Sequence, residues 1–264
     1  MGVLPDGPLS LWLDQYGEYT AEPAVEGEVD VDVAVIGGGL TGLATTVHLK
    51  RQDPSVRVAV LEAKTVGYGA SGRNGSFAMT VIGLGFGTTA LLRGKDFLRR
   101  AHAYMERSVD ELEHFIDEDR LDCAKIRPGF LRVATAPSYV KRLQKQVELM
   151  KSLGFDGIDW IDAAATRKMV DSERYLGAMW EPRLLLIDPA RLVREEKRRA
   201  IELGARVFEH SPVLAIGAPA VYGGSGDGYR LVTADGVVSA AKLVFATNAY
   251  SHLFGELANK QAPA

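Results

Sequence analysis

The chain has 264 residues, a formal net charge of −3 at pH 7 and a hydrophobic fraction of 47%. This length accommodates one large domain or two modest ones, and the hydrophobic fraction suffices for a sizeable core. The small net charge argues against nucleic acid and anionic membrane surfaces as partners. A single cysteine, Cys123, excludes an internal disulfide and a cysteine-based metal site, and no secretory signal or transmembrane run is recognisable. We therefore expect a cytoplasmic protein.

Residues 1–28 are expected to form an extended N-terminal arm, because this stretch holds several prolines and acids. A helical turn is expected at residues 9–13. Trp12 and Tyr16 are the side chains expected to anchor the arm on the body of the protein.

A glycine-rich turn follows the first strongly apolar run of the chain. Residues 31–61 predict a strand, an amphipathic helix and a second strand, and the turn before the helix reads Gly-Gly-Gly-Leu-Thr-Gly. This is the layout of a βαβ unit that holds a dinucleotide. In such a unit Gly37 permits the tight turn, Gly39 lets the backbone approach a pyrophosphate, and Gly42 lets the helix pack closely on the strand. The unpaired N–H groups at the helix N-terminus suit a phosphate.

Glu62 ends the second apolar run, twenty positions after Gly42. A carboxylate at that spacing can accept hydrogen bonds from ribose hydroxyls, and it disfavours a 2′-phosphate because two anions would repel each other. Lys64 weakens the second argument, since it places a cation close by. The motif alone leaves FAD and NAD both open.

A second glycine-rich loop, residues 67–76, favours flavin. Arg73 offers a planar fork of donors for phosphate, and Ser71 and Asn74 offer short hydrogen-bonding groups. A flexible surface loop is the alternative interpretation of this composition. The position of the loop just beyond Glu62 suits the lining of the remainder of an extended cofactor.

Residues 77–187 are expected to form a substrate-side layer with mixed α+β structure. Apolar residues at three- and four-residue steps predict a long helix over 91–119, and the charges on its other face, including Glu106 and Glu113, are interpreted as a solvated surface. The other elements expected in this layer are a strand at 129–134, a helix that Ser138 caps and that ends at Leu153, a short helix that starts at Asp162, and a strand or sheet edge at 175–186.

Residues 188–264 are expected to return to the dinucleotide-binding domain. Asp188, Pro189 and Gly204 bracket a helix as N-cap, first residue and C-terminal stop. The elements expected after it are a strand at 206–209, a β-meander at 215–236 with turns at 223–226 and 234–236, and a buried strand at 242–247 that points back at the cofactor.

Five segments of the chain together resemble a known family. They are Ser10–Leu13, Asp32–Gly39, Gly69–Gly75, Ile187–Val193 and Ala246–Tyr250. Through them the sequence resembles the D-amino-acid-oxidase-type FAD-dependent oxidoreductases, in particular the bacterial branch that includes gamma-glutamylputrescine oxidase. The resemblance implies FAD, oxidation of an amine or amino acid to an imine by hydride transfer to the flavin, and dioxygen or another acceptor that reoxidises it.

The fold class that the resemblance implies is α/β. It consists of a Rossmann-like FAD/NAD(P)-binding βαβ domain, made of residues 29–76 and 188–264, and a second α+β substrate layer that is incomplete. Val213 matches the family position whose backbone meets the adenine, and Ala246 and Thr247 resemble flavin contacts. The cofactor-binding residues expected are Gly37, Gly39, Leu40, Thr41, Gly42, Glu62, Ala63, Lys64, Ser71, Gly72, Arg73, Asn74, Gly75, Val213, Ala246 and Thr247.

Two departures from the family pattern affect what is expected. Some relatives attach FAD covalently, but the second loop holds Arg73 and Asn74 in place of a histidine, and Cys123 lies in no flavin-facing motif. Non-covalent FAD is therefore expected. The family pattern also continues well past the Ala-Thr-Asn-Ala-Tyr segment, whereas this chain stops at Ala264. The substrate layer is therefore expected to lack a part, and a second chain is one source of the missing half.

No catalytic residue and no metal ligand is identified from the sequence. Ser76, Phe77 and Met79 are candidates for contact with the flavin ring, and the last two are equally well explained as core. His102 and His114 have no other ligand nearby, so no metal site is expected. Three functions stay open: an FAD-dependent amine or amino-acid oxidoreductase, a non-catalytic FAD-binding fragment or subunit of a split enzyme, and an NAD-dependent dehydrogenase.

Overall fold

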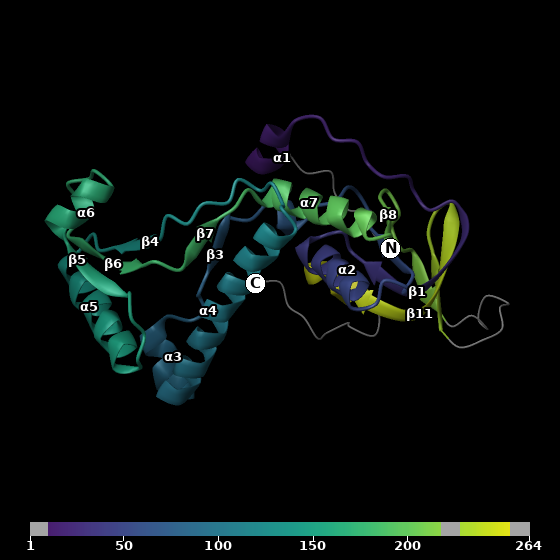
Figure 1. Ribbon diagram of the computed structural model, residues 1–264. Coiled ribbons are helices and arrows are strands. Elements are labelled where there is room, and N and C mark those ends of the chain that lie inside the picture. Colours follow the sequence, from purple (N-terminus) through teal and green to yellow (C-terminus); the bar gives the residue numbers. More distant parts are fainter. Residues whose placement is uncertain (1–9, 218–227, 254–264) are drawn as a thin grey trace. The chain divides into compact units, whose positions relative to one another are not determined.

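The computed structural model describes residues 10–217 and 228–253, which form two compact units (Figure 1). Unit 1 comprises the described residues of 1–75, 121–123 and 188–264, and unit 2 comprises residues 76–120 and 124–187. The N-terminal arm and the short segment 121–123 therefore belong to the same unit as the glycine-rich turn.

Unit 1 is built on a six-stranded sheet in the order β8-β2-β1-β11-β10-β9. Strand β1 pairs in parallel with β2 and β11, β2 pairs in parallel with β8, and β10 runs antiparallel to β11 and β9. This mixed sheet with a parallel βαβ core confirms the predicted α/β class. Its strands are β1 (Gly27–Ile36), β2 (Val58–Leu61), β8 (Arg206–Phe208), β9 (Ala215–Gly217), β10 (Tyr229–Val232) and β11 (Gly236–Phe245).

Two helices, α2 (Leu40–Gln52) and α7 (Pro189–Glu202), pack against each other in unit 1. The predicted cap of α7 is confirmed, because Asp188 Oδ1 accepts hydrogen bonds from the N–H groups of Ala190 and Arg191, at 3.0 Å each. The apolar runs of the parallel strands are buried, as strands covered on both faces require. One buried cluster of the sheet holds Val29, Val31, Ala34, Ile36, Ala59, Leu61 and Leu231, with further apolar residues around them.

The N-terminal arm packs on unit 1 through a short helix, α1 (Leu11–Tyr16), close to the predicted turn. Both predicted anchors are confirmed: Trp12 Nε1 donates to the carbonyl of Asn74 at 2.9 Å, and the Arg194 guanidinium lies 3.9 Å from the ring centre of Tyr16. The same guanidinium lies 3.9 Å from the ring of Tyr19. Cation–π contacts thus fix the arm to helix α7.

Unit 2 combines two small antiparallel sheets with four helices. Strands β4 (Phe130–Val133) and β5 (Asp159–Asp162) flank β6 (Gly177–Glu181), and β3 (Phe77–Met79) pairs with β7 (Leu184–Leu186). The core lies between the helices and the three-stranded sheet and includes Leu98, Met150 and Met179. The helices are α3 (Phe86–Arg93), α4 (Lys95–Glu118), α5 (Pro137–Ser152) and α6 (Ala163–Met169).

Several sequence-based expectations of local structure are wrong in detail. The helix predicted over 91–119 is interrupted at Gly94, whose φ of +86° breaks the helical path. Helix α5 has Ala136 as its N-cap and Pro137 as its first residue, so Ser138 lies inside the helix. The end of strand β11 is half-exposed from Leu243 to Phe245, where a buried strand was expected. The expected turn at 223–226 lies outside the described residues.

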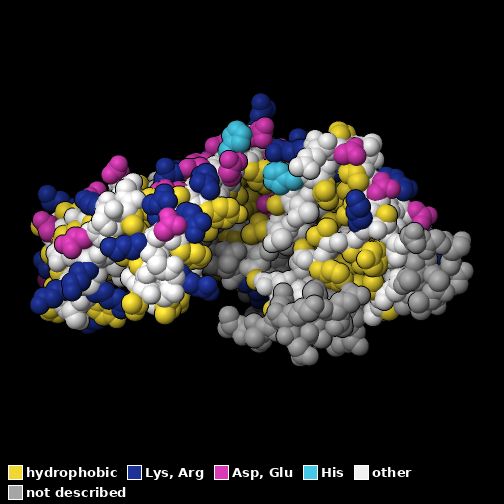
Figure 2. Space-filling view, turned by 90° about the horizontal axis from the view of Figure 1, so that it is seen from below, with side chains coloured by type: hydrophobic (Ala, Val, Ile, Leu, Met, Phe, Trp, Pro, Cys, Tyr) yellow, Lys and Arg dark blue, Asp and Glu magenta, His cyan; other side chains and the backbone are white. Residues whose placement is uncertain are grey.

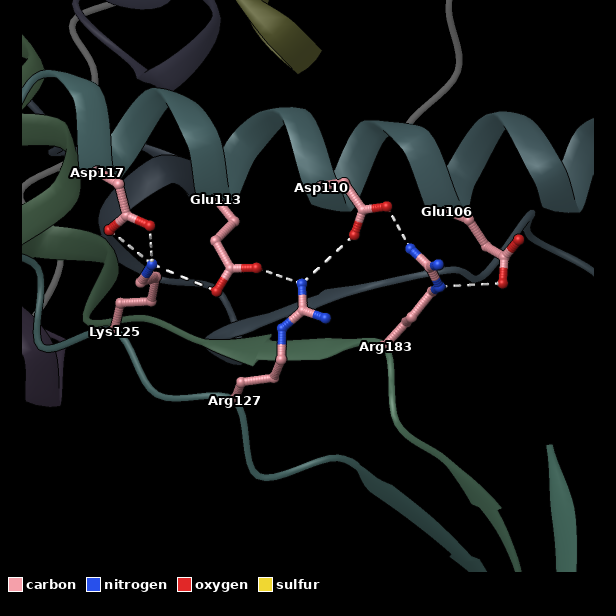
Figure 3. A network of polar contacts seen from close by, with 7 residues as sticks. All are labelled: Glu106, Asp110, Glu113, Asp117, Lys125, Arg127 and Arg183. Carbon is pink, nitrogen blue, oxygen red and sulfur yellow. Dashed lines mark hydrogen bonds and ion pairs between the residues drawn. The ribbon is translucent and has the colours of Figure 1, made fainter. Parts of the chain in front are cut away.

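A ladder of charges runs along one side of helix α4 (Figure 3). Its acids are spaced by three or four residues and pair with three cations from the chain that follows. Lys125 Nζ lies 2.7 Å from Asp117 Oδ2, and Arg183 Nε lies 3.2 Å from Glu106 Oε1. The interpretation of these charges as a merely solvated surface is therefore wrong for Glu106 and Glu113. The ladder consists of Glu106, Asp110, Glu113, Asp117, Lys125, Arg127 and Arg183.

His102 of helix α4 is fully buried and has no hydrogen-bond partner on either ring nitrogen within the described residues. Its ring contacts Phe86 and Phe155 edge-on, with centroids 5.3 and 4.4 Å away. The Glu106 carboxylate lies 3.9 Å from Nε2. Burial, with a smaller contribution from the Arg183 guanidinium, lowers the pKa of His102 to about 4.

We predict that His102→Phe removes a pH dependence of stability. The unfolded chain protonates this histidine near pH 6.5 and the folded chain only near pH 4, so the free energy of unfolding decreases as the pH falls between these values. The slope is about 1.4 kcal/mol per pH unit. We expect urea unfolding to show that His102→Phe increases the free energy of unfolding, relative to the unsubstituted protein, by more at pH 5 than at pH 7.5. The exposed His114→Phe is the control, and equal gains at both pH values would refute the prediction.

Candidate functional site

The glycine-rich turn between β1 and α2 is held by close backbone contacts. Gly37 has a φ of +112°, and a Cβ at this position would lie 2.5 Å from the carbonyl oxygen of Ala246. Its N–H donates to the carbonyl of Leu61 at 2.8 Å. A Cβ on Gly42 would collide with the carbonyl oxygen of Gly37. The tight turn expected of Gly37 and the close packing expected of Gly42 are therefore both found.

The N-terminus of helix α2 keeps backbone donors available. Its N-cap, Gly39, provides no side-chain acceptor, and Leu40 N–H donates to Ser71 Oγ at 3.0 Å. The N–H groups of Thr41 and Gly42 donate to no acceptor in residues 10–217 and 228–253. Unpaired amides at the positive end of a helix dipole attract an anion. The turn is thus suited to a phosphate group.

Glu62 at the end of β2 is oriented by two backbone amides. Its Oε2 accepts from Gly38 N–H at 2.8 Å and its Oε1 accepts from Lys64 N–H at 3.0 Å. Burial raises the pKa of this carboxyl group, while these hydrogen bonds oppose the rise. Each carboxylate oxygen has a further lone pair. The carboxylate is therefore fixed in place and still able to accept hydrogen bonds from hydroxyls.

The segment that precedes Val213 is tied to the same region of unit 1. The carbonyl of Lys64 accepts from His210 N–H at 2.7 Å, and the carbonyl of Glu62 accepts from Ser211 N–H at 2.8 Å. Ala63 lies between these two carbonyls in the chain. The side chain of Val213 is buried in the core cluster of the sheet, so only its backbone can serve a ligand.

The end of strand β11 closes on the glycine-rich turn from another side. Ala246 N–H donates to the carbonyl of Ile36 at 2.9 Å, and the Ala246 carbonyl lies against Gly37. The hydroxyl groups of Thr247 and Ser251 are 2.7 Å apart. Residues far apart in the sequence thus meet around one backbone bend.

In the second glycine-rich loop, the side chains that sequence analysis assigned to the cofactor bond to the loop itself. Arg73 Nε donates to the carbonyl of Tyr68 at 2.7 Å, and its guanidinium lies 4.9 Å from the Tyr68 ring centre. Asn74 Nδ2 donates to the carbonyl of Ser71 at 2.9 Å. Gly72 is buried against the carbonyl of Gly67, whereas Gly75 is exposed.

The structure therefore brings one group of predicted residues together around the bend. This group contains Gly37, Gly39, Leu40, Thr41, Gly42, Glu62, Ser71 and Ala246. Ser71 enters it through its hydroxyl oxygen, which accepts from the Leu40 N–H at the start of α2. Arg73 and Asn74 donate hydrogen bonds within the second loop.

Two residues that stabilise this region were missed by sequence reasoning. Gly38 supplies the amide that orients Glu62, and a Cβ on it would lie 2.9 Å from Glu62 Cβ. Glu209 is fully buried and accepts hydrogen bonds from the Tyr19 hydroxyl at 2.8 Å and from Val66 N–H. The position of Glu209 directly after a strand, as with Glu62, was the available sequence signal.

Neither a metal site nor a membrane span is found in the part of the chain that the structure describes. No group of three or more His, Cys, Asp or Glu side chains there could hold a metal ion. Among the described helices, none has the length and apolar character needed to cross a membrane.

Comparison with known proteins gives a consistent family assignment. The family model described as FAD dependent oxidoreductase (DAO) matches residues 32–264. Gamma-glutamylputrescine oxidoreductase of Escherichia coli K12 is 32% identical over 250 residues, which cover 93% of this chain and 56% of that protein. Glycine oxidase of Bacillus licheniformis is 28% identical, over 83% of this chain and 54% of that protein. The chain thus spans about half the length of these relatives.

The fold is also similar to solved structures. The crystal structure of glycine oxidase from Geobacillus kaustophilus matches with a TM-score of 0.72 and 21% sequence identity, over 86% of this chain and 58% of that chain. L-proline dehydrogenase from P. horikoshii matches with a TM-score of 0.68 and 20% identity, over 90% of this chain and 58% of that one.

We predict that Gly37→Ala destabilises the protein by about 2 kcal/mol or more, because the new Cβ meets the Ala246 carbonyl and the backbone has a left-handed φ. Gly69→Ala is the matched control, since a Cβ there meets nothing within 4 Å. Urea unfolding should separate the two variants. Equal stability of both would contradict the described packing of the bend.

Proposed function

Because the chain belongs to the DAO family of FAD-dependent oxidoreductases, we propose that it binds FAD without a covalent bond and that it oxidises an amine or an amino acid. Family membership supports the reaction class, and the site at the β1–α2 bend supports the cofactor. The observation that carries the proposal is the pair of unpaired amides, Thr41 and Gly42, beside the fixed carboxylate of Glu62.

The residues around the bend fit the parts of FAD. The Thr41 and Gly42 amides and the α2 dipole would hold the diphosphate. Glu62 would accept hydrogen bonds from the ribose hydroxyls, as the fixed orientation of its carboxylate allows. The backbone of Val213 would meet the adenine. The second loop and the Ala246–Thr247 segment would line the remainder of the cofactor.

The chain's own contribution to the reaction is binding and positioning. When bound, FAD supplies the two-electron acceptor that takes hydride from the carbon bearing a neutral amine and is then reoxidised by dioxygen or another acceptor. We assign no residue to proton transfer. Non-covalent attachment is favoured because Cys123 is buried and the second loop holds Arg73 and Asn74 in place of a histidine.

The substrate is proposed as a small amine or amino acid. The names of the relatives given above support this class, since they act on gamma-glutamylputrescine and glycine. The chain spans about half of these relatives, so a second chain that completes the substrate layer belongs to the proposal as an alternative. The NAD-dependent alternative lacks such support, because the family that the chain belongs to uses FAD.

We predict that the purified protein binds FAD and that Glu62→Gln weakens binding by roughly tenfold to a hundredfold, because an amide accepts fewer hydrogen bonds than a carboxylate. Binding should also weaken as the pH falls through the raised pKa of Glu62, since protonation removes an acceptor. Quenching of flavin fluorescence on titration measures both effects. Glu111→Gln, an exposed site on α4, is the control. An absence of FAD binding would defeat the proposal.

Amine oxidation is tested separately from cofactor binding. We expect a panel of amines and amino acids to include compounds that bleach the bound oxidised flavin without oxygen and that yield peroxide with oxygen. Binding of FAD without bleaching by any member of the panel would contradict catalysis by this chain and favour the binding-fragment alternative.

A further inference from the structure

Unit 2 contains a groove between helices α3 and α5 that has no part in the proposed FAD site. Its volume is about 610 Å³, within the range of small-molecule sites. Gly85, Gly87 and Thr88 of the α3 N-terminus line it together with polar and apolar residues of α5. The visible face of unit 2 carries many Lys and Arg side chains (Figure 2).

The charge of the groove is entirely positive. Lys141, Arg142 and Lys145 line it, and none of the other lining residues is acidic. In the described part of the chain none of these three cations makes an ion pair, although the Arg142 guanidinium lies 6.0 Å from the ring centre of Tyr139. Like charges at a spacing of three and four residues on a helix repel each other. An anion in the groove would relieve this repulsion.

The N-terminus of α3 faces the same groove, and no side chain caps it. Gly85 is its N-cap and no side chain accepts from its first turn. Within residues 10–217 and 228–253, the N–H groups of Phe86, Gly87 and Thr88 donate to no acceptor. The first helical hydrogen bond is donated by Thr89 N–H to the carbonyl of Gly85, at 2.9 Å. Three amide donors are therefore available to an anion.

The glycines at this helix start have no local structural requirement. A Cβ on Gly85 or Gly87 would meet nothing within 4 Å, and neither residue has a left-handed φ. Glycine here leaves the backbone open to close approach from outside, which is the use that glycine has in phosphate-binding loops. The alternating sequence Gly83-Leu84-Gly85-Phe86-Gly87 was the sequence signal for this arrangement.

A buried polar side chain also points to a ligand. Gln146 lines the groove although only 7% of the residue is exposed. Its Oε1 accepts from Arg132 Nη1 at 3.4 Å, and its amide nitrogen has no acceptor among the described residues. This nitrogen is therefore a donor that an acceptor atom of a ligand in the groove could satisfy.

We propose that this groove binds the phosphate group of a phosphorylated ligand. Backbone amides at a helix start, lysine and arginine are the groups that proteins use for phosphate. Leu91, which is 84% exposed, and Leu149 supply an apolar wall for the organic part of the ligand. The phosphate belongs either to a soluble ester or to a lipid headgroup. This site lies in unit 2 and is independent of the FAD proposal.

The first test measures the binding of phosphate-containing probes to the full chain. Excess FAD is present, so that the proposed diphosphate site of unit 1 is already occupied. Pyrophosphate is titrated calorimetrically, and sedimentation is measured with vesicles of phosphatidylcholine containing one-quarter phosphatidylglycerol. We expect binding to pyrophosphate or to these vesicles that weakens as salt is added. Pyrophosphate binding assigns a soluble ligand, and binding to the vesicles alone assigns a headgroup. Binding to neither would overturn the proposal.

The second test locates the site with matched variants. Replacement of Lys141, Arg142 and Lys145 by Ala should weaken binding by about tenfold or more, because charge-assisted hydrogen bonds are lost. The control replaces three exposed cations of unit 2 outside the groove and removes the same charge: Arg107, Lys168 and Arg174 to Ala. If both triple variants lost the same binding affinity, the loss would follow from net charge alone, and the proposed site would be refuted.

A single substitution separates binding from stability. Gly85→Asp should cap α3 and keep or raise the melting temperature, while its carboxylate occupies the amides and repels phosphate. Gly85→Ala leaves the amides open, so it should retain binding. Undiminished binding by Gly85→Asp would overturn the proposal even if the triple variants were too unstable to measure.

Discussion

The close approach of three backbone segments at one bend is the constraint on which unit 1 depends. Strand β1 must end, turn and enter α2 while the Ala246 carbonyl lies against Gly37 and the Glu62 side chain lies against Gly38. Only a residue without a Cβ fits at Gly37 and at Gly42. The same lack of side chains leaves the α2 amides open to a ligand, so the packing requirement and the proposed binding site have one physical cause.

Long-range hydrogen bonds hold this bend in place. Glu209 accepts from Val66, from the Tyr19 hydroxyl and from Glu22 N–H at 2.7 Å, and so joins the N-terminal arm, the loop after β2 and strand β8. Lys197 Nζ lies 3.4 Å from the same carboxylate and offsets part of its burial cost. A buried carboxylate with this many donors makes the arrangement of the segments specific.

The parts of the fold that could be predicted are those with local signals. The βαβ unit and the α7 cap follow from apolar runs, glycines and the Asp188–Pro189 pair, which lie close together in the sequence. The break at Gly94 was missed because the apolar pattern continues across it. The hydrogen bond that Ser71 accepts from Leu40 N–H was missed because Leu40 is 31 residues away.

The charged ladder of unit 2 also depends on partners that are distant in the sequence. The acids of α4 recur at helical spacing, but their partners Lys125, Arg127 and Arg183 come from other segments, so the sequence alone could not distinguish paired acids from solvated ones. The groove cations stand at the same helical spacing as the ladder acids, yet no acid of the groove faces them. The same helical spacing of charges is therefore found in a paired set on α4 and in an unpaired set on α5.

Amide hydrogen exchange with and without FAD tests the central claim most directly. If the diphosphate is held by the bend, FAD should slow exchange in residues 38–43 and 62–64, and should leave residues 83–88 of unit 2 unchanged. Binding of FAD with no protection of residues 38–43 would contradict the account.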